Sequence, residues 1–195
     1  KDSDPKYIIE ANMATGDTVH TVKITKSVNF DGLNEFPAVS GAVVTLTDDQ
    51  GSSIQLSEDS AGYYNAINYN AVPGRTYTLN VEHDGFDFEA KSTIPSPSLF
   101  DTMAFIPAGF GDTGFLIVPL YFDDVNAKNF YAFEYLLLNP DPENPDRDIY
   151  SGLILRDDGI TNGLVSQQPL FEGFTVKSGD QIAIAMYGID EDVHR

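Results

Sequence analysis

Hydrophobic and polar residues alternate in short runs that recur about every ten residues through the first half of the chain. Val22 and Ile24, for example, alternate with Lys23 and Thr25. This period is expected of a strand with one buried and one wet face. The pattern predicts seven strands, at Tyr7–Asn12, Thr21–Val28, Ala42–Thr47, Ser53–Leu56, Gly62–Ile67, Tyr77–Glu82 and Phe86–Ser92. Such a succession is typical of an antiparallel β-sandwich.

Turn residues separate these runs. Asp84-Gly85 predicts a tight hairpin because both residues tolerate positive φ. The segment 48–51, Asp-Asp-Gln-Gly, predicts a similar turn, and Pro73-Gly74 predicts another ahead of Tyr77. The strands are therefore expected to follow one another as antiparallel neighbours.

The segment 94–98, Ile-Pro-Ser-Pro-Ser, interrupts the pattern, because its prolines fix φ and remove backbone donors. We place a domain boundary there, between residues 1–95 and residues 96–195. The second part is again β-rich, with strands expected at Phe115–Phe122, Phe130–Leu138, Tyr150–Leu155, Phe171–Val176 and Gln181–Tyr187. Asn139–Asp148 is its longest expected loop, and only Asp124–Asn129 is expected to form a short helical turn. The sequence thus predicts an all-β protein of two antiparallel β-sandwich domains in tandem.

The charge balance narrows the range of partners. There are 30 Asp and Glu against 11 Lys and Arg, a formal net charge of -19. A protein that binds nucleic acid, or an anionic membrane through a basic patch, needs an excess of positive charge. Both kinds of partner are therefore disfavoured. Cysteine is absent, which excludes disulfides, thiolate zinc sites and cysteine nucleophiles within these residues. Residues 1–10 lack the basic and apolar regions of a signal peptide.

Catalytic motifs are not found in the sequence. No G-x-S-x-G motif occurs, and the three histidines are His20, His83 and His194. We expect His20 and His83 to be solvated residues at strand or hairpin edges. A glycosidase needs only two carboxylates at a set separation, and a chain this acidic supplies such a pair in any fold. The number of acidic residues therefore does not indicate a glycosidase. Tyrosines that could stack on a sugar, with packing as the more ordinary role, are Tyr63, Tyr64 and Tyr69. We therefore predict no catalytic residue, no enzyme activity and no cofactor.

Acidic loops are the remaining candidates for chemistry, because calcium prefers several oxygen ligands from one loop. The calcium candidates are Asp123, Asp124 and Asn126, with further acidic residues within 141–148 and at 157–158. None of these segments has the EF-hand spacing. Acidic turns between strands are also common without calcium, because Asp and Asn side chains hydrogen-bond to their own backbone. Gly109–Gly114 is rich in glycine but lacks the lysine of a phosphate loop, and we expect a flexible loop there.

The order of motifs along the chain resembles a family of Bacteroidetes surface lipoproteins, domain of unknown function 4249. The resemblance rests on the segments Lys6–Glu10, Val22–Phe30, Pro37 with Val39–Leu46, Gly62-Tyr63, Pro73–Leu79 and Thr93–Pro95. Taken alone, the part from Gly62 to Leu79 is similar to prealbumin-like or carboxypeptidase-regulatory-like sandwich domains. Phe122–Asp124, Asn129–Tyr131 and Gly179-Asp180 are similar to the second half of the family.

The resemblance implies immunoglobulin-like or prealbumin-like sandwiches and an exported, outer-membrane or cell-surface protein. It implies a lipid anchor on an N-terminal cysteine outside these residues, and frequent association with a TonB-dependent outer-membrane transporter. It implies no enzyme activity. Relatives continue beyond His194-Arg195, so the second domain is expected to be incomplete in this sequence.

Three classes of function stay open. The first is a non-catalytic surface module that binds a partner protein or a nutrient ligand for a TonB-dependent transporter. Its expected contacts are loops such as Leu33–Ser40 or Asn139–Asp148. The second is a structural or adhesin-like assembly protein that pairs through its edge strands. The third is a hydrolase, which would need convergent polar side chains in a deep pocket. Oligomeric state and ligand do not follow from the sequence.

Overall fold

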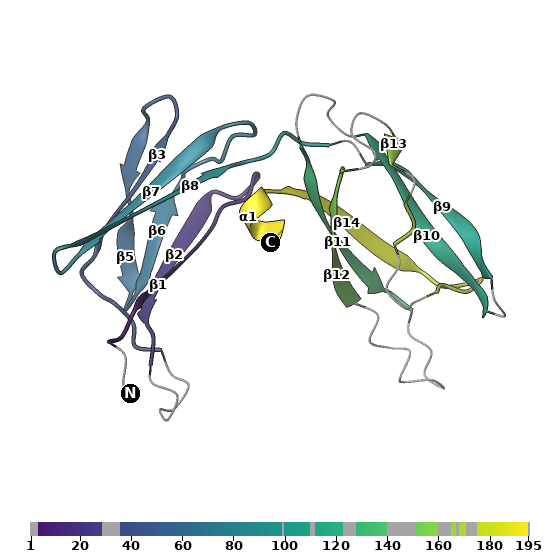
Figure 1. Ribbon diagram of the computed structural model, residues 1–195, viewed down its shortest axis with the longest axis horizontal. Coiled ribbons are helices and arrows are strands. Elements are labelled where there is room, and N and C mark those ends of the chain that lie inside the picture. The colour runs from purple at the N-terminus through teal and green to yellow at the C-terminus, as the bar shows by residue number, and fades with distance from the viewer. Residues whose placement is uncertain are drawn as a thin grey trace. The chain divides into compact units, whose positions relative to one another are not determined.

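The computed structural model in Figure 1 describes residues 4–28, 36–98, 100–109, 112–122, 128–139, 151–159, 165–166, 168–170 and 175–194. The protein is all-β, as predicted, and is built from antiparallel sheets with one short helix. It divides into two compact units, Lys1–Ile94 and Pro95–Arg195, which we call unit 1 and unit 2. Each unit is described by itself.

Unit 1 contains two four-stranded sheets. Its strands are β1 (Tyr7–Asn12), β2 (Val19–Lys26), β3 (Val43–Asp48), β4 (Ser53–Gln55), β5 (Ser57–Ser60), β6 (Tyr63–Ile67), β7 (Thr76–His83) and β8 (Phe86–Thr93). One sheet has the order β1-β2-β6-β5 and the other β4-β3-β7-β8. These are the orders A-B-E-D and C′-C-F-G of an immunoglobulin-type sandwich.

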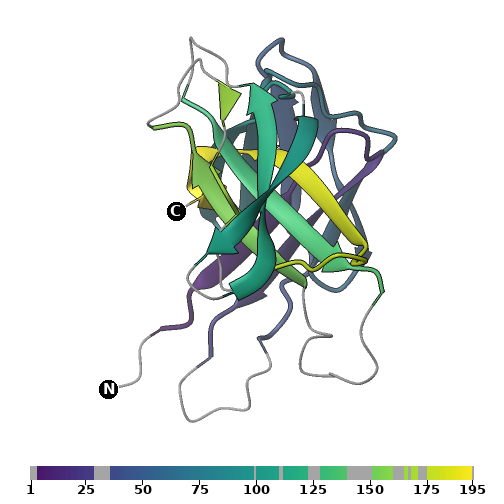
Figure 2. The ribbon, with the colours of Figure 1, turned by 90° about the vertical axis from the view of Figure 1, so that its right-hand side faces the viewer.

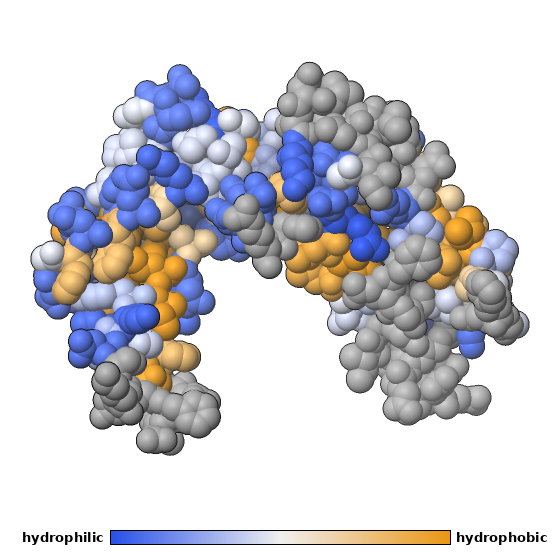
Figure 3. Space-filling model, viewed as in Figure 1, coloured by the Kyte–Doolittle hydropathy of each residue, from blue (hydrophilic) through white to orange (hydrophobic). Residues whose placement is uncertain are grey.

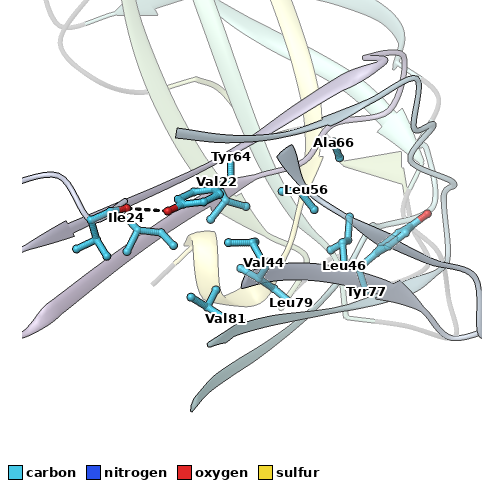
Figure 4. Packing of buried hydrophobic residues seen from close by; sticks show 11 residues of the cluster. Val22, Ile24, Val44, Leu46, Leu56, Tyr64, Ala66, Tyr77, Leu79 and Val81 are labelled. Atoms are coloured by element: carbon cyan, nitrogen blue, oxygen red, sulfur yellow. Dashed lines mark hydrogen bonds between the residues drawn. The ribbon is translucent and has the colours of Figure 1, made fainter. Parts of the chain in front are cut away.

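The core of unit 1 lies between its two sheets. Figure 4 shows Val22 of β2 and Tyr64 of β6 facing Val44 of β3 and Leu79 of β7. The Tyr64 hydroxyl donates to the Val39 carbonyl at 2.8 Å and accepts from the Ala42 N–H at 3.0 Å. A buried phenol needs such partners, so Tyr64 fixes the segment that enters β3.

The predicted turns of unit 1 are confirmed. Asp84 (φ 52) and Gly85 (φ 78) both have positive φ, as a two-residue type I′ hairpin requires. At Pro73-Gly74, the Arg75 N–H donates to the Val72 carbonyl at 3.3 Å while Gly74 has φ 77. This is the geometry of a type II turn, in which proline precedes a glycine.

The alternation in β2 is only partly as expected. Val22 and Ile24 are buried, but Thr25, predicted to face water, is also buried. The segment 36–40 covers it, because Ala38 bridges to Thr25 and the Lys26 N–H donates to the Pro37 carbonyl. Strand β5 was not predicted, since its sequence Ser-Glu-Asp-Ser carries no apolar residue.

The described residues of unit 2 form two three-stranded sheets. Its elements are β9 (Phe100–Gly109), β10 (Asp112–Phe122), β11 (Phe130–Leu137), β12 (Ser151–Asp157), β13 (Val165–Ser166), β14 (Ile182–Ile189) and the helix α1 (Glu191–His194). The sheet orders are β13-β10-β9 and β12-β11-β14. In Figure 2, β9 and β10 lie in front of the other sheet. The shared core contains Ile117, Tyr121, Tyr131, Phe133, Ile154, Leu170 and Val176.

Several predictions for unit 2 are wrong. The region 109–114, expected to be a flexible loop, includes the end of β9 and the start of β10, which pair from Gly109 to Asp112. Strand β9 was missed because polar residues and Pro107 interrupt its pattern, and proline is tolerated there only since β9 is an edge strand. Helix α1 was also missed. Of the predicted strand Phe171–Val176, the described part forms one isolated bridge, from Val176 to Phe115.

The expected turn at Asp124–Asn129 lies mostly outside the described residues, and the two that are described, Lys128 and Asn129, are not helical. Within the part of the chain that the structure covers, no helix is both long enough and apolar enough to span a bilayer.

Candidate binding surface

The sheet β12-β11-β14 is apolar on both of its faces. Strand β11 reads Phe-Tyr-Ala-Phe-Glu-Tyr-Leu-Leu, and a near-continuous apolar run is typical of a strand that is covered on both sides. Tyr131 and Phe133 point into the core of unit 2. The alternate residues of β11 must therefore project from the other side of the sheet.

The strand register identifies the residues of this second side, which we call the outer face. Across the three strands they are Phe130, Ala132, Glu134 and Leu136 of β11, Ser151, Leu153, Leu155 and Asp157 of β12, and Ala183, Ala185, Tyr187 and Ile189 of β14. All but Ser151, Glu134 and Asp157 are apolar. In Figure 3, apolar residues gather over the position of these strands.

The outer face is covered at one end and exposed at the other. Phe130 and Ala132 are buried, and α1 lies against β11. Farther along the same face, Leu136 is 51% exposed and Leu153 56%, while Tyr187, directly opposite Ala132 on β14, is 48% exposed. A contiguous group of large exposed apolar side chains, unlike a scattered one, marks an interaction site.

Of the two acidic residues of the outer face, Asp157 lies at the end of β12 and Glu134 lies in the middle strand β11. The Tyr187 hydroxyl donates to Glu134 Oε2 at 3.1 Å. This hydrogen bond and the negative charge of Glu134 raise the pKa of Tyr187, so the phenol keeps its proton. The pair gives this largely apolar surface a fixed hydrogen-bond acceptor. Such an acceptor favours a partner that brings a hydrogen-bond donor or a cation.

The histidines do not form a catalytic site with the described residues around them. His20 is buried, not solvated as expected, and its Nε2 lies 2.9 Å from the Tyr69 carbonyl. His83 lies 2.8 Å from the Tyr7 hydroxyl through Nδ1 and 3.2 Å from the Ser40 carbonyl through Nε2. Both are explained by hydrogen bonds that tie strands to loops. The side chain of His194 lies outside the described residues.

The three tyrosines considered for stacking on a sugar differ in how deeply they are buried. Tyr64 is a core residue, and burial raises its pKa. Tyr69 packs against the same core, and burial raises its pKa too. Only Tyr63 is substantially exposed, at 42%. One exposed ring does not make a sugar-binding platform.

The calcium candidates Asp123, Asp124 and Asn126 lie outside the described residues, as do residues 141–148. In the remaining acidic pair, Asp158 is buried and its Oδ2 accepts from the Asn129 backbone N–H at 2.9 Å and from Asn129 Nδ2 at 3.0 Å. Asp157 accepts from the Gly159 N–H at 3.2 Å. Over the described part of the chain, no group of three potential metal ligands is found.

The loops proposed as contacts fall largely outside the described residues. The exceptions are 36–40, which packs along β2, and Asn139, whose Nδ2 donates to the Gly179 carbonyl at 2.9 Å. Sequence reasoning missed the outer face, although the signal was present in β11. The residues of β11 do not alternate between apolar and polar, so its sequence alone does not mark one face as exposed to water.

Comparison with curated proteins gives no match to this chain. The family model described as domain of unknown function (DUF4249) matches residues 1–195, the whole chain. Its span agrees with the order of motifs from Lys6 to Asp180 that resembled this family. The protein therefore belongs to the DUF4249 family.

Proposed function

We propose that the protein is a non-catalytic module of the cell surface that binds a partner protein through the outer face of the β12-β11-β14 sheet. It is exported, anchored to the outer membrane by a lipid outside these residues, and acts beside a TonB-dependent transporter. Its sandwiches are of the immunoglobulin-like or prealbumin-like kind. The exposed apolar residues of the outer face carry this proposal.

The energetics of this surface suit protein recognition. Full burial of a leucine or aromatic side chain contributes about 1.5–3 kcal/mol. Leu136, Leu153 and Tyr187 are each about half exposed and lie on neighbouring strands. Tyrosine is among the residues enriched at the energetic centre of interfaces. A partner that covers these side chains gains affinity without a deep pocket.

The test is a pull-down from detergent-solubilised outer membranes with the full-length lipidated protein as bait. Leu153→Gln removes an apolar contact from the outer face, and Ile67→Gln is its matched control in unit 1. Both residues are 56% exposed on sheet strands. We expect a TonB-dependent transporter with the parent protein and with Ile67→Gln, and about tenfold less with Leu153→Gln.

Equal recovery of the transporter with both variants would contradict binding at the outer face. Recovery of the bait alone, with self-association by light scattering, would favour a second function. In that case the protein assembles with its own copies through edge strands, as an adhesin-like structural protein does. The eight-residue exposed edge strand β8 is the observation that supports this alternative.

A further inference from the structure

The outer face carries a carboxylate at its centre, that of Glu134 in the middle strand β11. In the register of the sheet, Leu153 of β12 lies directly opposite Glu134 on one side and Ala185 of β14 on the other. Both neighbouring positions are therefore filled, and neither side chain carries a charge. A strand added at an edge of the sheet would lie two strands away. The sheet neighbours of this carboxylate are thus fixed by the three described strands.

The three half-exposed apolar side chains of the outer face surround Glu134. Leu153 is its direct cross-strand neighbour, and Leu136 is the next residue on the same side of β11. Tyr187 donates its hydroxyl hydrogen to Glu134 Oε2 at 3.1 Å. Directly opposite side chains of a sheet are about 4.5–5.5 Å apart at Cβ, and alternate residues of one strand are about 7 Å apart. A partner that covers these three side chains therefore covers the carboxylate as well.

Covering an ionised carboxylate is unfavourable unless the partner replaces its hydration. In the free protein Glu134 is exposed, so water satisfies the acceptor sites that Tyr187 leaves open. An apolar partner would remove this water and return no hydrogen bond. A partner that binds the outer face must therefore bring hydrogen-bond donors to Glu134, and a positive charge with them.

The described part of the chain supplies no such charge. No lysine or arginine within it forms an ion pair with Glu134. Lys128 Nζ lies 4.6 Å from the centroid of the Phe130 ring, and Arg156 belongs to the inward side of β12, as its register with Tyr131 shows. The outer-face positions themselves hold neither lysine nor arginine. The positive charge has to come from the partner.

Arginine suits these surroundings better than lysine does. A guanidinium is less strongly hydrated than an ammonium, donates two parallel hydrogen bonds to one carboxylate and stacks on aromatic rings. Glu134 offers the carboxylate, held by the hydroxyl of Tyr187, whose ring lies beside it. The methylene groups of an arginine can also pack on apolar neighbours such as Leu153. Arginine is, moreover, among the residues enriched at the energetic centre of interfaces.

The same carboxylate disfavours a second copy of this chain as the occupant. If two outer faces met about a two-fold axis through their centres, the two Glu134 carboxylates would approach each other in an apolar interface. We propose that Glu134 determines what the outer face binds, which is a partner segment that presents one arginine between apolar side chains. This inference rests on the proposed function, because it concerns the same face.

The test is selection from a random peptide library on the immobilised full-length protein, with Leu153→Gln for counter-selection. We expect the peptides that require Leu153 to share an arginine flanked by apolar residues. Peptides that require Leu153 but carry no arginine would overturn the proposal and leave the outer face as a binding surface. A library that yields no Leu153-dependent peptide would overturn both this proposal and the proposed function.

Neutralisation of Glu134 measures the contribution of its charge. Glu134→Gln keeps the shape of the side chain and removes the charge. Glu82→Gln is the matched control, because it removes the same charge from an exposed position on β7, an inner strand of a sheet of unit 1. We expect a selected peptide to bind Glu134→Gln about thirtyfold or more weakly than the parent protein, and Glu82→Gln as tightly as the parent. Equal affinities for the two variants would overturn the proposal.

An exchange of charges separates an ion pair from a disturbed fold. Glu134→Arg should lose the selected peptide and bind instead a peptide in which glutamate replaces the arginine. A misfolded variant could not gain this new ligand. A peptide with lysine in place of arginine should bind the parent protein more weakly than the arginine peptide. Absence of the new ligand with Glu134→Arg, or equal binding of the lysine peptide, would overturn the proposal.

The free protein decides between a partner and a second copy. We expect the full-length protein to be a monomer by light scattering. A dimer that Leu153→Gln dissociates would identify a second copy as the occupant of the outer face, and would overturn the proposal.

Discussion

At the scale of single residues, Gly62 is a glycine of unit 1 that a larger residue cannot replace without strain. It has φ +76, and its carbonyl accepts from the Ile24 N–H at 2.8 Å. A Cβ at this position would lie 2.6 Å from the Ile24 carbonyl oxygen, which is backbone and cannot rotate away. Positive φ and the close approach of two backbone segments together require glycine.

We predict that Gly62→Ala lowers the free energy of unfolding by about 2 kcal/mol or more, because it adds a steric clash to an unfavourable φ. Gly51→Ala is the control: it also has positive φ, +85, but nothing lies within 4 Å of the added Cβ. Gly51→Ala should lower the free energy of unfolding by about 1 kcal/mol. Urea denaturation measures both, and equal losses would show that the close contact has no role.

Asp48 fixes the turn after β3. Its Oδ1 accepts from the backbone N–H groups of Gln50 and Ser52, and its Oδ2 pairs with the Arg75 guanidinium. Burial raises the pKa of Asp48, but the two backbone hydrogen bonds and Arg75 outweigh it and hold the pKa below the ordinary value of 3.8. The ionised carboxylate is thus the form that the fold prefers.

We predict that Asp48 stabilises the fold above its ordinary pKa of 3.8 and that this contribution is lost as pH falls through the lower folded pKa. Asp48→Asn should therefore be less stable than the parent protein at pH 7. The difference between the two should shrink in acid, as measured by denaturation across this range. If the difference in stability between the parent protein and Asp48→Asn did not change with pH, the charge of the carboxylate would have no part in stabilising the fold.

At the scale of elements, prediction succeeded where local chemistry and tertiary environment agree. The β7-β8 hairpin has alternating strands and an Asp-Gly turn, so its sequence specifies it completely. Strand β5 has no apolar residue and forms because β6 offers it an edge. Strand β9 forms as the partner of β10, despite Pro107. Short or irregular edges depend on their neighbours more than on their own residues.

The outer face of β12-β11-β14 is also a property of paired elements and not of single residues. The apolar run of β11 predicts a strand, but not which alternate residues face the core. The register with β12 and β14 decides this, and it places Leu136 beside Ser151 and Ala183 on the exposed side. The candidate site could not be found from a motif, because it is a property of three strands together.

At the scale of the whole molecule, each unit has its own core cluster, and the division falls at Ile94 and Pro95. The core of unit 1 draws on both of its sheets, and all eight of its strands precede Pro95. The net charge of -19 disfavours nucleic acid as a partner at this scale. The charge does not bear on the fold.

We predict that residues 1–94 alone fold into unit 1. The reason is that two four-stranded sheets with a shared core bury their own apolar faces. The isolated segment should show one cooperative urea transition, with a slope of about 1 kcal/mol per molar, and near-UV circular dichroism from its buried tyrosines. A broad transition with strong binding of a hydrophobic dye would contradict this.

The sequence by itself determined the all-β class, the regular hairpins such as the one at Asp84-Gly85, and membership of a family through the order of its motifs. These follow from local periodicity and turn chemistry, which act over a few residues. Tertiary structure alone decided that Thr25 and His20 are buried and that β5 and β9 are strands. Burial and strand pairing depend on what the rest of the chain places beside a residue, and no local pattern contains that information.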